Sequence, residues 1–186
     1  PLGSVNYALK NLMPWVIFVL FKIMSVFSSK SITYSAIILP VVLFLISIIG
    51  FFLFNYSAFS IKFSKKFAAS TALLASFLYA ILPPILHRTV AGVPEIESLG
   101  LAWLWFALFF FILAWKSESR KKQLIYSLIA GILTGLMSWS WGGYRYIYMA
   151  IALTSFVFFI LEKEKEKNFL IFSSWIIPAL VFEFIR

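Results

Sequence analysis

Long apolar segments alternate with short polar ones along almost the whole chain. None shows the every-second-residue alternation of a half-buried strand, and each is bounded by charged residues, proline or glycine, which end or interrupt helices. A helix needs about 20 residues to cross the hydrocarbon core of a bilayer. Segments of about this length run over 33–54, 67–86, 99–115, 124–140, 146–161 and 169–185. The pattern predicts six membrane-spanning helices.

An earlier apolar segment, 11–27, is short and carries Pro14 near its start and Lys22 in its middle. We interpret it as a helix lying along the membrane interface, with a membrane-spanning helix as the alternative. Residues 1–4 resemble the remnant left when an affinity tag is cleaved off. The predicted organisation is therefore a tag remnant (1–4), the end of an outward loop with the interfacial helix (5–32), and a partial transmembrane domain (33–186).

Proline and glycine mark features inside the predicted spans. Pro40 and Pro178 would kink or break a helix unless neighbouring groups satisfy the carbonyls that they release. Gly131 and Gly135, four residues apart, give one span a small-residue face for close helix packing, or occur by chance in a glycine-tolerant membrane helix.

The composition is that of a membrane protein. Hydrophobic residues make up 62% of the 186 residues and charged residues 12%, and the mean hydropathy is +0.97. These values exclude an ordinary soluble domain. The absence of cysteine excludes disulfides and thiolate metal sites. We predict an all-α fold: a polytopic membrane helical bundle with about six transmembrane helices plus one interfacial helix.

The basic residues gather in every second connection. They are Lys62, Lys65 and Lys66, then Lys116, Arg120, Lys121 and Lys122, then Lys163, Lys165 and Lys167. Connections rich in lysine and arginine face the cytoplasm, so the connections 28–32, 87–98 and 141–145 should face outward. The net charge of +9 is thus explained by topology, and we expect no nucleic-acid partner.

One outward connection carries most of the candidate chemistry. It contains the single histidine of the chain, Arg88, and the pair Glu95 and Glu97. In an extended backbone the two glutamates leave from the same face, where they repel unless a cation lies between them. Mg²⁺ or Mn²⁺ prefers such oxygen ligands, and Arg88 is placed to neutralise the pair or to hold an anionic oxygen. Spacing alone favours the alternative, two ordinary charges in a solvated loop.

A second outward connection reads Ser140-Trp141-Gly142-Gly143-Tyr144 and is followed by Arg145. The glycines let backbone amides approach a ligand, the two aromatic rings suit the depth of lipid headgroups, and Arg145 adds a positive charge. This combination suits a lipid phosphate. The alternative is a tight turn at the membrane interface, anchored by its aromatic side chains.

Taken together, the two connections resemble the catalytic subunit of oligosaccharyltransferases. His87-Arg88-Thr89-Val90-Ala91-Gly92, followed by Glu95-Ile96-Glu97, is similar to that family's second acidic motif, an S-R-S/T-x-A-G run followed by an acidic pair. The S-W-G-G-Y string is similar to the family's signature two spans later. The resemblance covers most of the chain. It departs from the family at Glu95, where aspartate is usual, and the longer side chain alters the reach to a metal.

The resemblance implies a GT-C glycosyltransferase-like fold and a metal-dependent reaction with Mn²⁺ or Mg²⁺. An oligosaccharide would pass from a polyprenyl (pyro)phosphate donor, a lipid-linked oligosaccharide, to Asn in an N-x-S/T sequon of an acceptor polypeptide. The catalytic residues would be Arg88, Glu95 and Glu97, with both glutamates as metal ligands. The residues bordering the donor's lipid phosphate would be Trp141, Gly142, Gly143, Tyr144 and Arg145. We expect an archaeal protein surrounded by membrane lipid, in the cell membrane or else the ER membrane, with its site on the extracytoplasmic or lumenal face.

Other acidic motifs and the sequon-reading segment of that family are not found in this sequence. We therefore expect an excerpt covering about the second to the seventh span, inactive by itself. The alternative enzyme is another glycosyltransferase that uses lipid-phosphate sugars, such as a protein mannosyltransferase, in which the W-G-G-Y string is not expected. A transporter segment is less favoured because its ionisable groups would lie inside the spans, where only Lys22 and Glu183 come near to qualifying.

Overall fold

The structure, a computed structural model, describes residues 11–27, 31–161 and 165–185. Within these ranges the regular elements are helices: α2 (Met13–Phe27), α3 (Ile32–Phe59), α4 (Lys65–Ile81), α5 (Pro83–His87), α6 (Ile96–Lys116), α7 (Arg120–Ser138), α8 (Tyr144–Leu161) and α9 (Lys165–Ile185). The predicted all-α fold is confirmed. The expected tag remnant at 1–4 lies outside the described residues.

Four of the described helices, α3, α6, α8 and α9, are long and apolar enough to cross a membrane. The two other predicted spans also form helices, but α4 has 17 residues and α7 begins with Arg-Lys-Lys-Gln. The predicted span 67–86 is too long at its end. Its helix stops at Ile81, Leu82 is extended with ψ 117°, and the short α5 follows. Pro83 disfavours a helical backbone at the residue before it, which explains the break.

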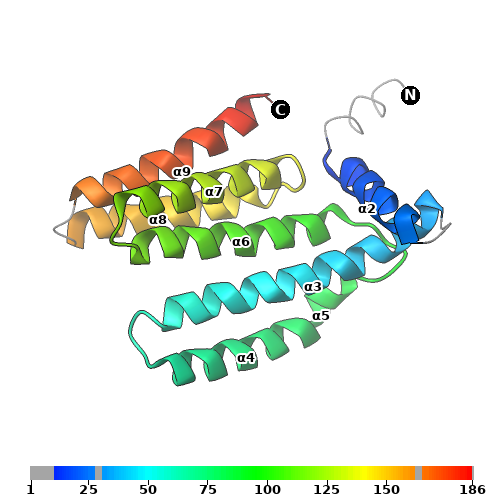
Figure 1. Ribbon diagram of the computed structural model, residues 1–186, viewed down its shortest axis with the longest axis horizontal. Helices are drawn as coiled ribbons and strands as arrows, with labels where there is room; N and C mark the ends of the chain where they lie inside the picture. The colour runs from blue at the N-terminus through cyan, green and yellow to red at the C-terminus, as the bar shows by residue number, and fades with distance from the viewer. Residues whose placement is uncertain (1–10, 28–30, 162–164, 186) are drawn as a thin grey trace.

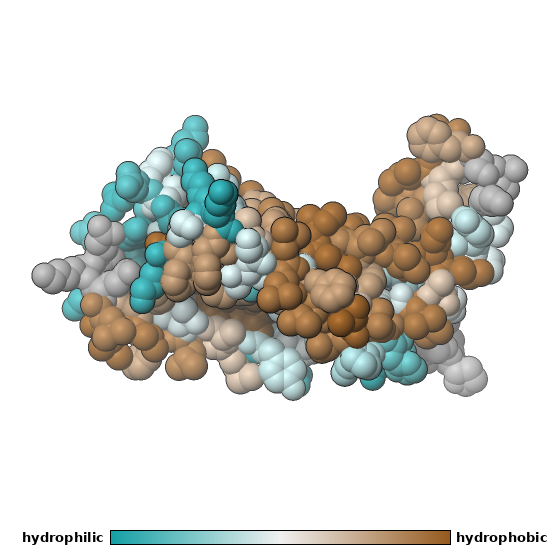
Figure 2. Space-filling view, turned by 90° about the horizontal axis from the view of Figure 1, so that it is seen from below, coloured by the Kyte–Doolittle hydropathy of each residue, from teal (hydrophilic) through white to brown (hydrophobic). Residues whose placement is uncertain are grey.

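The long helices run up and down along the long axis of the molecule (Figure 1). The α3–α4 and α6–α7 connections lie at one end, with the end of α8 and the start of α9. The α5–α6 segment and the α7–α8 turn lie at the opposite end. Hydrophilic residues gather at the first end, and an apolar surface covers the middle of the face shown in Figure 2. The connections therefore alternate as the charge pattern predicts, and the membrane side of each end stays a prediction.

Helix α2 lies at the end of the bundle opposite the basic connections, steeply inclined to the long helices (Figure 1). Its 15 residues are too few to cross a bilayer. Its buried residue, Met13, packs in a small core with Leu39 and Leu99. The backbone N–H of Leu12 also donates to the Trp139 carbonyl, at 3.4 Å. The helix is short and inclined, and its place at the membrane interface stays a prediction.

Helices α7 and α9 pack closely through the two glycines of α7. Gly131 lies against the Trp175 carbonyl and the Pro178 ring, and Gly135 lies against the Phe182 side chain. A Cβ atom on Gly135 would come within 2.5 Å of Phe182 Cβ. Helix α9 continues through Pro178, as α3 does through Pro40. The small-residue face is thus a packing surface, because α9 fills the space that the missing side chains leave.

A polar and aromatic cluster joins the other half of the bundle. Trp105 Nε1 of α6 donates to Tyr79 Oη of α4 at 3.0 Å, and Tyr79 Oη donates to Ser47 Oγ of α3 at 3.3 Å. Phe51 stacks on Tyr79 with ring centroids 4.6 Å apart. These hydrogen bonds satisfy polar groups that lipid would leave unpaired. They hold α4 against α3 and α6.

Candidate functional site

The predicted acidic pair lies at the start of α6, at the end of the bundle away from the basic connections (Figure 1). Glu95 is the residue before the helix and is extended, with φ −80° and ψ 141°, whereas Glu97 is in the first helical turn. The extended backbone considered for both glutamates is therefore found only at Glu95, because the helix begins between them. Carboxylates at a helix N-terminus are favoured by the helix dipole.

Arg88 brings the two carboxylates together. Its Nη1 donates to Glu95 Oε2 at 2.8 Å and to Glu97 Oε1 at 3.4 Å. About half of the Arg88 side chain is exposed, against about a quarter of each glutamate side chain. The hydrogen bond to Glu95 and the charges of both glutamates raise the pKa of Arg88 above its ordinary value. The guanidinium is thus a permanent positive charge beside the two carboxylates. Of the two roles predicted for Arg88, the structure shows the one in which it neutralises the pair.

The loop before the pair folds back on α3. Thr89 is buried, and its Oγ1 donates to the Ile85 carbonyl at 2.9 Å. Gly92 has a φ of +90°, which a side chain would strain, and its N–H donates to the Ile37 carbonyl of α3 at 3.0 Å. This backbone hydrogen bond fixes the loop next to the first turn of α6. The buried Thr89 and the Gly92 hydrogen bond therefore fix the backbone just before Glu95 and Glu97.

The W-G-G-Y string forms the tight turn between α7 and α8. The Trp141 N–H donates to the Met137 carbonyl at 2.8 Å, and the Tyr144 N–H donates to the Trp141 carbonyl at 3.3 Å. Trp141 packs on α6 where Gly100 has no side chain, since a Cβ there would lie 2.7 Å from Trp141 Cβ. A Cβ on Gly143 would meet the indole ring at 2.5 Å, whereas one on Gly142 would meet nothing within 4 Å. Gly143 therefore makes room for Trp141, and Gly142 faces open space.

A cavity of about 220 Å³ lies between the two predicted motifs. It is lined by Ile85, Arg88, Glu97, Leu101 and Trp141. The structure thus brings residues of the acidic motif together with the tryptophan of the turn, which lies two helices further along the chain. One part of the wall is charged and the rest is apolar. Such a lining suits a ligand with a polar group on an apolar body.

Tyr144 and Arg145 are outside the wall of this cavity. Tyr144 is 7% exposed, and its Oη donates to Glu183 Oε1 of α9 at 2.7 Å. Arg145 is exposed and lies over the Tyr144 ring, 5.8 Å from its centroid. Glu183 is not among the residues that the sequence predicts for the site, although it binds Tyr144. The signal in the sequence is a lone carboxylate near the end of an apolar segment, which needs a polar partner there.

The acidic pair offers only two of the side-chain groups that a divalent metal would need. Among the described residues, no group of three or more His, Asp or Glu side chains is placed to hold a metal ion. Glu95 and Glu97 offer the oxygen ligands that Mg²⁺ and Mn²⁺ prefer, but a full shell needs further oxygens. The Arg88 guanidinium also lies within hydrogen-bond distance of both carboxylates. The pair therefore fits a cation only with additional ligands, and in competition with Arg88.

Comparison with known protein families matches residues 1–185 to the family described as "Oligosaccharyl transferase STT3, N-terminal". A similar curated protein is the dolichyl-diphosphooligosaccharide–protein glycosyltransferase subunit STT3 of Dictyostelium discoideum. It is 30% identical over 91 residues, which are 48% of this chain and 12% of that protein. The matched part thus spans a small fraction of the relative's length.

Proposed function

The chain belongs to the STT3 family of oligosaccharyl transferases, which it matches over residues 1–185, and we propose on this premise that it forms part of an oligosaccharyltransferase membrane domain. The full-length enzyme would transfer an oligosaccharide from a polyprenyl (pyro)phosphate donor to Asn in an N-x-S/T sequon of an acceptor polypeptide. Its site would lie on the extracytoplasmic or lumenal face. The family match favours this function over the mannosyltransferase-like and transporter alternatives.

The observation that carries the proposal is the cavity between the acidic motif and the Trp141 turn. We propose that it receives the phosphate region of the lipid-linked donor. The Arg88 guanidinium would bind phosphate oxygens, for which its planar set of donors is suited. The apolar wall formed by Leu101 and Trp141 would contact the first part of the lipid. Gly142 in the turn and Arg145 at the start of α8, both exposed, would border the phosphate from outside the cavity.

We further propose that Glu95 and Glu97 bind Mn²⁺ or Mg²⁺ in the full-length enzyme, with oxygen ligands from outside this chain. The bound cation would supply Lewis-acid activation at the acceptor. Arg88 holds both carboxylates in the structure, and the cation would displace it from them, which would release its guanidinium for the donor phosphate. Two carboxylates do not complete a cation shell, so we propose that the chain alone is inactive. Robust transfer by the isolated chain to an Asn-x-Thr peptide, with donor and Mn²⁺ supplied, would contradict this.

The test uses a full-length protein that contains this membrane domain. Glu95→Gln and Glu97→Gln keep the size of each side chain but remove its charge. We expect activity to fall roughly 100-fold or more, as when charge stabilisation at a reacting centre is lost, and added Mn²⁺ to restore part of it. The matched control is Glu118→Gln in the exposed α6–α7 connection at the other end of the bundle. It should change activity little, because Glu118 is far from the site and an exposed charge contributes less than about 1 kcal/mol to stability. Equal activity of all three variants at limiting metal would exclude the pair from the mechanism.

A further inference from the structure

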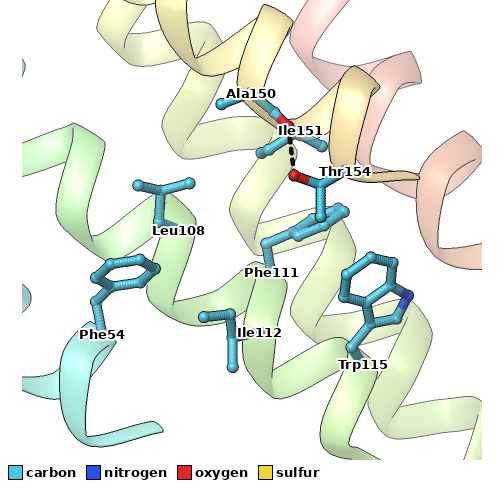
Figure 3. Close-up of a pocket in the computed structure, with 8 residues that line it drawn as sticks. All are labelled: Phe54, Leu108, Phe111, Ile112, Trp115, Ala150, Ile151 and Thr154. Atoms are coloured by element: carbon cyan, nitrogen blue, oxygen red, sulfur yellow. Dashed lines mark hydrogen bonds between the residues drawn. The ribbon is translucent and has the colours of Figure 1, made fainter. Parts of the chain in front are cut away.

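Two polar side chains of α8 are paired in different ways. Thr154 lines a hollow of about 290 Å³ between α3, α6 and α8, whose other lining residues are apolar or aromatic. Its hydroxyl donates to the Ala150 carbonyl of the same helix at 2.6 Å (Figure 3). Tyr144, the first residue of α8, instead donates from its hydroxyl to Glu183 Oε1 of α9 at 2.7 Å. The Tyr144 hydrogen bond therefore joins two helices, whereas the Thr154 hydrogen bond stays within one.

The last turn of α9 contacts both ends of the turn between α7 and α8, which lies at the same end of the bundle (Figure 1). Trp139 follows α7, and its Nε1 donates to the Phe182 carbonyl at 2.6 Å. The Trp139 and Phe182 rings also meet in a T-shaped contact, with centroids 5.9 Å apart. Because Glu183 binds Tyr144, two consecutive residues of α9 hold the two residues that flank the turn 140–143.

Glu183 is the single acidic residue of α9 after its first turn. Ionisable groups in apolar membrane helices are costly unless they are paired. The Tyr144 hydroxyl pairs with this carboxylate, and a hydrogen bond to a charged acceptor is stronger than one between neutral groups. Glu183 is outside the wall of the cavity between the acidic motif and the Trp141 turn. Any effect of Glu183 on that cavity must therefore pass through other residues.

Tyr144 connects Glu183 to the cavity wall. The Tyr144 N–H donates to the Trp141 carbonyl at 3.3 Å, and Trp141 lines the cavity together with Arg88 and Glu97. An anchored Tyr144 thus restrains the backbone that carries the indole. Without the acceptor on Glu183, Tyr144 would be held only by its remaining contacts, and the indole would spend less of the time in its place in the wall.

We propose that Glu183 is a positioning residue for the donor site. By holding Tyr144 it fixes the α7–α8 turn, and the turn keeps Trp141, on the apolar side of the cavity, in place before the donor binds. This inference rests on the proposed function, since it concerns the fit of the donor to that cavity. A role in helix packing alone would lower stability without changing the affinity for the donor.

The test compares Glu183→Gln and Glu183→Leu in the full-length protein that contains this membrane domain, with a polyprenyl (pyro)phosphate-linked oligosaccharide and an Asn-x-Thr peptide as substrates. Glutamine keeps an oxygen acceptor and leucine has none. We expect Glu183→Leu to raise the KM for the donor about fivefold, the equivalent of one lost hydrogen bond. Its kcat should change little, because Arg88 holds Glu95 and Glu97 at the start of α6. Glu183→Gln should keep most of the affinity for the donor.

A nitroxide label gives a second readout, which needs no transfer reaction. Gly142→Cys in a cysteine-free version of the full-length protein places the label in the turn, where an added Cβ meets nothing within 4 Å. We expect the label to gain mobility in Glu183→Leu and to keep its mobility in Glu183→Gln. The matched control is Tyr79→Phe, which removes a hydrogen bond between α4 and α3 and does not alter the cavity lining. It should lower the melting temperature with the donor KM and the label mobility unchanged.

An unchanged donor KM in Glu183→Leu, when the wild-type protein transfers the oligosaccharide, would overturn the inference and leave the proposed function intact. Equal increases of KM in Glu183→Leu and Tyr79→Phe would also overturn it, since they would indicate general destabilisation. Unchanged label mobility would mean that Glu183 does not hold the turn. A wild-type protein that neither binds nor transfers the donor would contradict the proposed function, and the label would then decide by itself whether Glu183 fixes the turn. If Glu183→Leu does not fold, Tyr144→Phe removes the same hydrogen bond from its donor side and is tested by the same measurements.

Discussion

Trp141 fits between α6 and the α7–α8 turn because residues on two sides of it lack side chains. Gly100 leaves room on α6 and Gly143 leaves room in the turn itself. The indole in turn forms part of the cavity wall beside Arg88 and Glu97. The shape of the candidate site therefore depends on two glycines that would contact no ligand themselves.

The two neighbouring glycines of the turn should respond differently to substitution. Gly143→Ala places a methyl group 2.5 Å from the Trp141 ring, and such overpacking costs about 1–3 kcal/mol. We expect a lower melting temperature and a shift in tryptophan emission. Gly142→Ala meets nothing within 4 Å and is the matched control, expected to leave both measurements nearly unchanged. Equal destabilisation by the two substitutions would contradict this packing.

The Tyr144–Glu183 hydrogen bond predicts a second difference between neighbours. Tyr144→Phe removes a donor that is 2.7 Å from Glu183 Oε1 and leaves the acceptor without it. A lost hydrogen bond of this kind costs about 1 kcal/mol or more, measured as the free energy of unfolding in detergent. Tyr146→Phe, on the same helix with Tyr146 70% exposed, is the control and should have little effect. No difference between the two variants would mean that the bond does not hold α8 to α9.

Residue chemistry was partly predictable at this site. Charged residues among apolar ones need partners, so the sequence predicts that Arg88 lies near Glu95 and Glu97. The structure pairs them. The inward turn of Tyr144 was not predictable, because it depends on α9 lying beside α8. Sequence spacing carries no information on which helices become neighbours.

At the scale of the helices, the α7–α9 contact depends on which atoms face each glycine. Gly131→Ala would push a methyl group into the Trp175 carbonyl, a backbone atom that cannot move without shifting α9. Gly135→Ala meets Phe182 Cβ at 2.5 Å, an atom that rotation of the side chain does not move, so α9 must shift here too. We expect Gly131→Ala and Gly135→Ala each to lower the free energy of unfolding by about 1–3 kcal/mol.

Ile132→Ala is the control for these variants, since Ile132 is 39% exposed on the same helix. It should change the free energy of unfolding less than Gly131→Ala does. A larger loss in Ile132→Ala than in Gly131→Ala would mean that α7 and α9 do not pack through the two glycines of α7.

Helix boundaries were predicted less well than helix existence. The apolar pattern continues through 82–86, so hydropathy extended a span that Pro83 in fact ends. Helix α6 starts at Ile96, before the apolar run does, because its first turn takes in Glu97. A hydrophobic pattern does not detect polar residues in a first helical turn, so the helical conformation of Glu97 was not predictable from it.

For the whole molecule, the positive-inside pattern predicts the side on which each end lies. The chain has no cysteine, so a single added thiol reports one position. Val93→Cys, 47% exposed in the α5–α6 segment, should react with an impermeant thiol reagent on intact cells. Ser119→Cys, exposed at the start of α7, should react only after permeabilisation. The reverse labelling would place the Glu95 end in the cytoplasm.

The overall architecture was the most predictable property, because hydrophobic length and loop charge act over whole segments. The alternation of connections between two ends follows from those two quantities and agrees with the fold (Figure 1). The cavity beside Trp141 does not follow from them. It arises where α5, α6 and two connecting segments meet, at distances that only packing determines.

The backbone hydrogen bond from Gly92 to Ile37 has a genetic consequence. A peptide carbonyl is present whichever residue occupies position 37, so a codon change there alters the side chain and leaves the acceptor in place. At position 92 the φ of +90° favours glycine, and proline would also remove the donor. Both residues contribute one group to the bond. Selection to keep the bond would therefore act on the residue at position 92 and not on the side chain at position 37.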